Sequence, residues 1–149
     1  MHVKIVDVAQ WNKGKMFEQY QKLGKYPIIS CSVEVDVTRI YEAARRERTS
    51  FWLMFIHAIG QTINHFEAFR HRVVLDQVLL FDPIKVRLAT LDKARRYYFM
   101  LLPLAGSLTE LRAAYKAEKR RMEALPVEER ETPTPPNCFV LNILPQVRL

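Results

Sequence analysis

The chain has 149 residues, of which 49% are hydrophobic and 26% charged, a composition that fits one soluble globular domain with a sizeable core. The stretch 1–4 lacks the apolar character of a signal peptide. The longest apolar window, 51–63, contains His57 and Gln61, which favours a buried helix over a membrane span. We therefore expect a single domain over 1–149, with no membrane partner.

The net charge of +7 raises the question of an anionic partner such as nucleic acid, a membrane surface or a phosphorylated cofactor. The basic residues form three mild clusters, at 45–48, 93–96 and 119–121, with acidic residues among or beside them. This pattern is typical of a solvated surface, and no nucleic-acid motif accompanies it. An anion-binding basic domain stays open as a minor hypothesis, and we expect no nucleic-acid partner.

Cysteine usage points to a reducing compartment. The two cysteines, Cys31 and Cys138, lie far apart and match no metal or redox spacing. We expect a cytoplasmic protein without a metal site.

The N-terminal part predicts a strand, a helix and a second strand. Residues 3–7 read as a short strand, and 11–20 as a helix ended by Gly24 and Pro27. The clearest strand signal is 29–35, where apolar and polar residues alternate. Its apolar face would hold Ile29, Cys31, Val33 and Val35, and its polar face Ser30, Ser32, Glu34 and Asp36.

Two helices are expected next. Asp36 or Thr38 can cap a helix through 40–44, and Thr49-Ser50 can cap a longer one over 51–66. We interpret His57 as packed or partly exposed. We interpret His65 and His71 as surface residues.

The second half predicts a meander, a helix and a last strand. The expected strands are 72–75, 78–81, 85–90 and 96–102, with a tight turn at Asp76-Gln77. Ser107 and Glu110 form a capping box that begins a helix running to Leu125. After a proline-rich loop, 138–144 is continuous enough for a central buried strand. The predicted fold class is α+β, a mixed α/β sandwich with helices covering a largely antiparallel sheet.

Several short motifs run in order along the chain and resemble the chloramphenicol acetyltransferase family. They are Asp7-Val8-x-x-Trp11 with Met16-Phe17-Glu18-x-Tyr20, the strand 33–38, the helix 55–69, the corner Phe81-Asp82-Pro83, and the closing Leu141-Asn142-Ile143-Leu144-Pro145-x-Val147. Each is weak alone, and their common order and spacing carry the resemblance. It implies a CoA-dependent acyltransferase-like fold, a trimer with a pocket at each subunit interface, and acetyl-CoA as co-substrate.

The resemblance also implies a general base, the histidine of a His-His-x-x-x-Asp-Gly motif in the last third of the family's length. The histidines of this chain are His2, His57, His65 and His71, and none is followed by Asp-Gly. We therefore expect a domain that is C-terminally truncated relative to the family and inactive alone.

Four residues match positions of the family's site. Asn142 falls on the serine that stabilises the oxyanion, and an amide can still donate a hydrogen bond there. Tyr20, Cys31 and Tyr97 fall on the acceptor pocket, as substrate-binding residues. Structural roles compete with these assignments: a core-facing tyrosine, a small buried thiol, and an amide that bonds a neighbouring backbone group. The arginine that pairs with the motif's aspartate falls on Lys13, which keeps the charge and loses the bidentate fork.

Two functions follow from the resemblance. The first is acetyl-CoA-dependent O-acetyl transfer to a small-molecule acceptor, with the histidine supplied by another chain or segment. The second is a non-catalytic module derived from the acyltransferase fold, which oligomerises or binds another protein chain.

Overall fold

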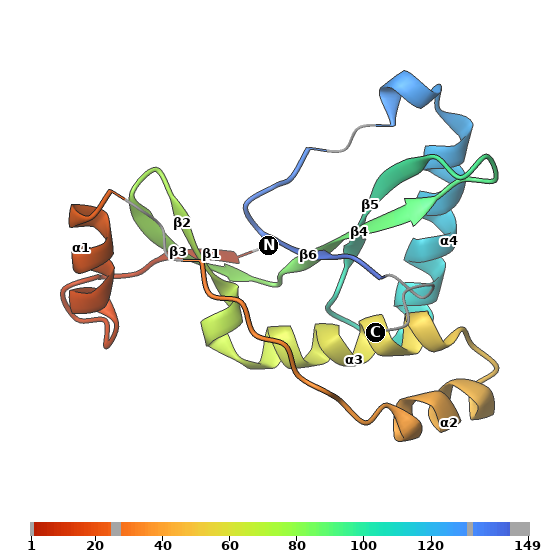
Figure 1. Cartoon of the computed structure of the whole chain (residues 1–149), viewed down its shortest axis with the longest axis horizontal. Helices are drawn as coiled ribbons and strands as arrows, with labels where there is room; N and C mark the ends of the chain where they lie inside the picture. Colours follow the sequence, from red (N-terminus) through yellow and green to blue (C-terminus); the bar gives the residue numbers. More distant parts are fainter. Residues whose placement is uncertain (1, 25–27, 131–132, 144–149) are drawn as a thin grey trace.

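The computed structural model describes residues 2–24, 28–130 and 133–143. Figure 1 shows α1 at one end of the molecule, α2 and α4 at the other, and the strands between them. The helices are α1 (Gly14–Lys22), α2 (Thr38–Arg46), α3 (Phe51–His65) and α4 (Leu108–Ala124), with short 3-10 helices η1 (Glu67–Arg70) and η2 (Val127–Glu129). The strands are β1 (His2–Ile5), β2 (His71–Val74), β3 (Gln77–Asp82), β4 (Lys85–Leu91), β5 (Tyr97–Pro103) and β6 (Cys138–Leu141).

The strands form two sheets. Sheet A has the order β1-β3-β2 and is antiparallel throughout. Sheet B has the order β5-β4-β6, with β5 antiparallel and β6 parallel to β4. The predicted α+β class with a largely antiparallel sheet is confirmed. The predicted meander is wrong, because β3 passes into β4 through a cis peptide bond at Asp82–Pro83 and the two strands belong to different sheets.

Helices α3 and α4 cover one face of sheet B. Along β4 and β5, buried residues alternate with more exposed ones, and Val86, Met100 and Leu102 are fully buried. From the helices, Ile56 and Met122 pack into the same cluster and are 1% exposed. Burying each such aliphatic side chain contributes roughly 1.5–3 kcal/mol. This layer is therefore the main core of the described residues.

Close backbone contacts fix α3 against the strands. A Cβ at Gly60 would lie 2.9 Å from Leu104 Cδ2 and 3.0 Å from its carbonyl oxygen, so only glycine fits there. The Asn64 side chain donates to the Gly60 carbonyl (3.0 Å) and accepts from the Ile84 backbone N–H (2.9 Å). These bonds set the position of the start of β4 relative to the helix.

The turn after β4 is tied to the end of α4 by charge. Asp92, whose side chain is 6% exposed, forms 2.8 Å ion pairs with Arg96 and Arg130. Arg130 also donates to the Leu125 carbonyl. Hydrogen bonds lower the pKa of Asp92 to about 2, and the bond from the Arg96 backbone N–H has the largest effect. The Asp92 carboxylate thus joins the β4–β5 hairpin to the segment that follows α4.

Local sequence signals gave mixed results at the helix and turn boundaries. The capping box at Ser107 and Glu110 is confirmed, with both reciprocal bonds present. The expected cap of α2 by Asp36 or Thr38 is wrong: the N-cap residue is Val37, and α2 has no side-chain capping bond. Asp36 instead accepts from the Thr38 backbone N–H (2.9 Å), two residues on. The Ser50 side chain makes no capping bond to α3. The β2–β3 turn lies one residue earlier than predicted, since Leu75 and Asp76 hold the positive φ angles, 49° and 61°.

The predicted strand 29–35 is not a strand in the structure. The segment is extended, and it pairs with no other strand of the described residues. Ile29, Val33 and Val35 are 85%, 73% and 64% exposed. Alternation selects an extended backbone with one apolar face, but a strand also needs a neighbour to bond, and the described residues provide none for this segment.

Two further predictions need correction. The last strand was predicted to be central, yet β6 forms an edge of sheet B, and its Val140 is 47% exposed. His71 was interpreted as a surface residue, yet its side chain is only 12% exposed, with the ring 5.0 Å from that of Trp11. Burial lowers the pKa of His71. Trp11 of the N-terminal segment covers His71, and the residues around position 71 in the sequence give no sign of this contact.

Candidate functional site

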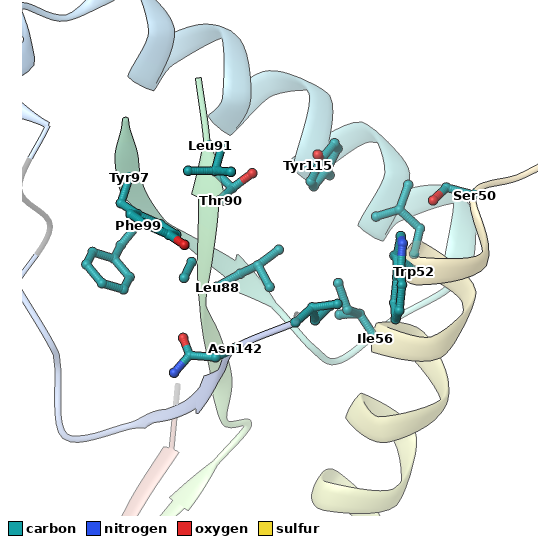
Figure 2. A pocket seen from close by; sticks show the side chains of 13 residues that line it. Ser50, Trp52, Ile56, Leu88, Thr90, Leu91, Tyr97, Phe99, Tyr115 and Asn142 are labelled. Carbon is teal, nitrogen blue, oxygen red and sulfur yellow. The ribbon is translucent and has the colours of Figure 1, made fainter. Parts of the chain in front are cut away.

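One pocket, of about 770 Å³, opens between the start of α3, the end of sheet B and α4. Figure 2 shows the side chains that surround it, with Trp52 on α3 and Ser50 directly before that helix, Tyr115 on α4, and Tyr97 and Asn142 on the opposite side. Its lining residues are Ser50, Trp52, Leu53, Ile56, Leu88, Ala89, Thr90, Leu91, Tyr97, Phe99, Tyr115, Asn142 and Ile143.

The lining of this pocket is aromatic and uncharged. None of the lining residues just named is acidic, basic or a histidine. Polar contacts can come from the Asn142 amide and from hydroxyls on Ser50, Thr90, Tyr97 and Tyr115. Such a lining suits a neutral, partly aromatic ligand. It can orient and hydrogen-bond that ligand, but no described lining side chain is a general base suited to neutral pH.

The sheet register brings two of the four expected site residues together. Tyr97 begins β5 opposite Leu91 and is 70% exposed. Asn142 follows β6 directly and is exposed. The sequence predicted Asn142 to lie within the last strand, whereas in the structure it lies beyond the end of that strand. Both side chains line the pocket (Figure 2).

The other two expected residues lie elsewhere. Tyr20 is half-buried on α1, which Figure 1 places at the far end of the molecule from α4. Cys31 is exposed in the unpaired segment, contrary to the expected packed position. Neither lines the pocket. Lys13 directly precedes α1. Grouping Tyr20 and Cys31 with the pocket therefore needs a contact that the described residues of one chain do not make.

His57 does not take over the role of a base. It lies on α3, with its Nε2 3.3 Å from the Gly106 carbonyl oxygen and 3.4 Å from the Gln61 side-chain nitrogen. Gln61 donates to the same carbonyl at 3.0 Å. These contacts attach α3 to the turn before α4. They agree with the packed or partly exposed position expected for His57.

Sequence reasoning missed the half of the pocket that the helices supply. Trp52 and Tyr115 lie within two of the predicted helices and Thr90 within a predicted strand, and none of the three was chosen as a site residue. Their shared position arises from the packing of α3 and α4 over β4, which brings together residues far apart in the chain. No signal within the sequence marks Trp52 as a pocket residue, because its 37% exposure is a property of the folded chain.

Tyr98 carries the same phenol group as the pocket residues Tyr97 and Tyr115, but it is buried and is not among the lining residues. It is 2% exposed, its hydroxyl lacks a hydrogen-bond partner among the described residues, and burial raises its pKa to about 12. Tyr98 therefore stays protonated at physiological pH. In the part of the chain that the structure describes, no cluster of three or more His, Cys, Asp or Glu residues could hold a metal ion.

The family model for chloramphenicol acetyltransferase matches residues 1–147. The chain belongs to the chloramphenicol acetyltransferase family. The match spans both sheets and the pocket, so the pocket lies inside the family's own fold. A solved chloramphenicol acetyltransferase superimposes with a TM-score of 0.77 over 99% of this chain and 72% of that chain, at 18% identity, which shows the same fold.

Curated relatives give the same family at low identity. A chloramphenicol acetyltransferase of Staphylococcus aureus is 23% identical over 147 residues, which are 97% of this chain and 67% of the relative. Those of Klebsiella sp and Escherichia coli are 23% identical over 79 residues, 53% of this chain and 36% of each relative. The chain thus matches at most about two thirds of the length of these chloramphenicol acetyltransferases. None of the helices described is long and apolar enough to cross a membrane.

Proposed function

We propose that the pocket is an acyl-transfer site that holds a small neutral acceptor and the acyl end of acetyl-CoA, and that its general base comes from outside the described residues. The observation that carries this proposal is the uncharged pocket in which Tyr97 and Asn142 meet. On a fold shared with chloramphenicol acetyltransferases, this arrangement supports chloramphenicol as the first acceptor to test.

The roles of the residues follow from their chemistry. Asn142 would donate its amide N–H to the oxyanion that develops when the acceptor hydroxyl attacks the thioester carbonyl. Tyr97 would pack against the acceptor. Trp52 and Ser50 lie at the α3 side of the pocket and would face the CoA end. The basic stretch 45–48 directly precedes this part of the chain. The attack also needs a base to take the hydroxyl proton, and no described lining residue supplies one.

Because the base is missing from the described lining, we propose that the chain works with a partner chain. Self-association into a homo-oligomer, a trimer by resemblance to the family, would place a second copy beside each pocket. The alternative is a non-catalytic module that uses the same fold to oligomerise or to bind another protein. The fold shared with chloramphenicol acetyltransferases makes acyl transfer the first of the two functions to test. The two functions differ in whether the pocket binds acetyl-CoA.

Tryptophan fluorescence can test the pocket directly. The chain has two tryptophans, and only Trp52 lines the pocket, whereas the Trp11 ring lies against that of His71 in a tilted arrangement. Titration with chloramphenicol or acetyl-CoA should change the fluorescence of the wild type and of Trp11→Phe. The change should be lost in Trp52→Phe. The binding site would be refuted if neither ligand, at millimolar concentration, changed the emission of Trp11→Phe or gave heat in calorimetry.

Turnover is tested separately. We expect the purified chain alone to show no acetyl-CoA-dependent thiol release with chloramphenicol. If thiol release occurs and survives His57→Ala, the chain contains a base that the described lining does not account for, and the need for a partner's base is refuted. If the pocket binds chloramphenicol but not acetyl-CoA, the non-catalytic alternative gains support.

A further inference from the structure

The α1 segment, defined here as residues 7–24, lies beside sheet A at one end of the molecule (Figure 1). Its contact with the sheet includes the ring of Trp11, which lies 5.0 Å from that of His71 on β2. Gln21 adds a long hydrogen bond of 3.5 Å to the Asp76 carbonyl in the β2–β3 turn. Within α1, which the structure describes in full, the first glycine is the only buried residue. The attachment of the α1 segment therefore depends on the Trp11–His71 contact.

The His71 side chain is buried without hydrogen bonds. It is 12% exposed, and neither of its ring nitrogens has a hydrogen-bond partner among the described residues. A neutral imidazole leaves one donor and one acceptor unpaired in such a place, whereas a protonated one leaves two donors and a positive charge. Burial accordingly has the largest effect on the pKa of His71, and lowers it. The packed arrangement thus favours the neutral ring.

The charged groups that face His71 from η1 and from the α1 segment partly cancel. The Glu67 carboxylate favours the protonated ring, but its oxygen is 3.6 Å from Nε2 and its side chain is 62% exposed. Lys13 and Arg70 oppose protonation, and each lowers the pKa of His71. Arg70 is paired with Asp82 at 3.1 Å, which weakens its repulsion. Lys13 belongs to the α1 segment, so its repulsion acts only while that segment is in place.

Sheet A contributes an apolar neighbour and further positive charge. Leu80 on β3 lies directly opposite His71, and Lys4 on β1 lies opposite Leu80, in the same row of side chains. Arg72 follows His71 on β2 and so points to the other face of the sheet, where its guanidinium donates to the His71 carbonyl at 2.7 Å. Neither the leucine nor the two cations can accept a hydrogen bond from a protonated ring.

We propose that the Trp11–His71 contact is a latch that holds the α1 segment on sheet A at neutral pH and opens in mild acid, when His71 takes up a proton. The latch does not depend on the acyl-transfer function, but its opening would displace Lys13 and Tyr20, which match positions of the family's site. In the open form the exposed ring regains its ordinary pKa of 6.5, whereas in the closed form the pKa is lower. Above pH 6.5 the ring is neutral in both forms and the latch is strongest. As the pH falls from 6.5 toward the pKa of the closed form, the ratio of closed to open chains falls by up to about ten-fold for each pH unit.

Trp11 itself reports the state of the latch. In Trp52→Phe it is the only tryptophan, and its quenching by acrylamide, a neutral quencher, measures how far it is exposed. We expect the quenching constant to be flat from pH 8 to pH 7 and to rise reversibly, at least about two-fold, by pH 5.5. In Trp52→Phe, His71→Phe an aromatic ring remains against Trp11 but cannot be protonated, so the constant should stay flat. A constant that is flat in Trp52→Phe as well, or that rises equally in both, would overturn the proposal.

Two controls separate the latch from general effects of acid. Trp52→Phe, His65→Phe makes the same substitution at an exposed histidine of α3 and should keep the pH response. The far-ultraviolet circular dichroism of Trp52→Phe should change little between pH 8 and pH 5.5. Loss of secondary structure over this range would mean that the whole chain unfolds, and would overturn a local latch. So would a His65→Phe variant that lacks the pH response.

Charge variants in the Trp52→Phe background test the same mechanism with His71 in place. Lys13→Gln removes a cation from the closed form, which then tolerates a proton better, so the midpoint of opening should shift to lower pH. Glu67→Gln removes the attracting carboxylate and should shift the midpoint to higher pH. Each shift should be at least about 0.3 pH unit, a two-fold change in proton affinity. Lys15→Gln makes the same change at an exposed residue of α1 and should leave the midpoint in place. An equal shift in Lys15→Gln, or shifts of the first two variants in the same direction, would refute the latch even if His71→Phe failed to fold.

Discussion

The helix-covered face of sheet B and the extended segment 28–36, here called the arm, show what the same sequence pattern does with and without a neighbour. Both alternate apolar and polar residues. On β4, Val86 is fully buried under the helices, whereas on the arm Val33 is 73% exposed. The difference lies in the partner and not in the pattern. Alternation tells which side chains share a face, and the topology decides whether that face is covered.

The largest expected effect comes from making the same truncation in both regions. Val86→Ala should destabilise the fold by about 2–3 kcal/mol, since it removes buried methyl groups and leaves a cavity. Val33→Ala should change the stability of the monomer by under about 0.5 kcal/mol. Urea denaturation at low protein concentration measures both. Equal losses would mean that the arm is packed in solution, and would break the comparison.

Loss of the ion pairs of Asp92 with Arg96 and Arg130 should have an intermediate effect on stability, and this effect should depend on pH. Asp92→Asn removes the charge paired with Arg96 and Arg130, and should lower the melting temperature by about 5 °C at pH 7. The folded-state pKa of about 2 lies below the ordinary value of 3.8. The carboxylate therefore stabilises the fold fully above pH 3.8, and this contribution is lost as the pH falls toward 2.

Differential scanning fluorimetry from pH 7 to pH 2.5 checks this sign. The wild type and Asp92→Asn should converge at the acidic end. Glu47→Gln is the control, because Glu47 is 54% exposed and its ion pair with Arg46 is 3.8 Å long. It should have almost no effect at either pH. A wild type and an Asp92→Asn variant that differ by the same amount at every pH would contradict a role of the charge.

The smallest effect should come from the start of α4. Ser107→Ala removes the side chain that accepts from the Glu110 backbone N–H, and should cost about 1 kcal/mol. Ser107→Asp keeps an accepting oxygen and should recover most of that loss, although it places two carboxylates close together. Chemical denaturation at matched ionic strength distinguishes them. A Ser107→Ala variant as stable as the wild type would show that the box contributes nothing beyond solvent.

Local chemistry in the sequence was enough for most elements but not for their arrangement. The capping box at Ser107 and the alternation along 85–90 depend on residues within a few positions of each other, and both predictions match the structure. The split into two sheets depends on the corner at Asp82–Pro83, where only Pro83 and Ile84 separate β3 in one sheet from β4 in the other. Nothing in local periodicity distinguishes such a corner from a hairpin turn.

The candidate site divides in the same way. Tyr97 and Asn142 were reached through motif positions, and the structure brings their side chains to one pocket. Trp52 and Tyr115 could not be chosen, because a helical aromatic on an apolar face reads as core until the neighbouring helix is placed. Cys31 could not be excluded, because its strand pattern is genuine and only its partner is missing from the described residues.

The parallel pairing of β6 with β4 also has a consequence for the order of folding. It joins Lys85 to Cys138, positions 53 residues apart (138 − 85), whereas β4 and β5 are linked by a short turn. Closing the longer loop costs more chain entropy and has to wait until α4 returns the chain to the sheet. The β4–β5 hairpin with α4 should therefore form early, and β6 should dock late. Amide protection in pulse-labelling experiments should therefore rise for Met100 before it rises for Phe139. During synthesis, the apolar β4–β5 hairpin would form before β6 docks and brings Asn142 and Ile143 to the pocket.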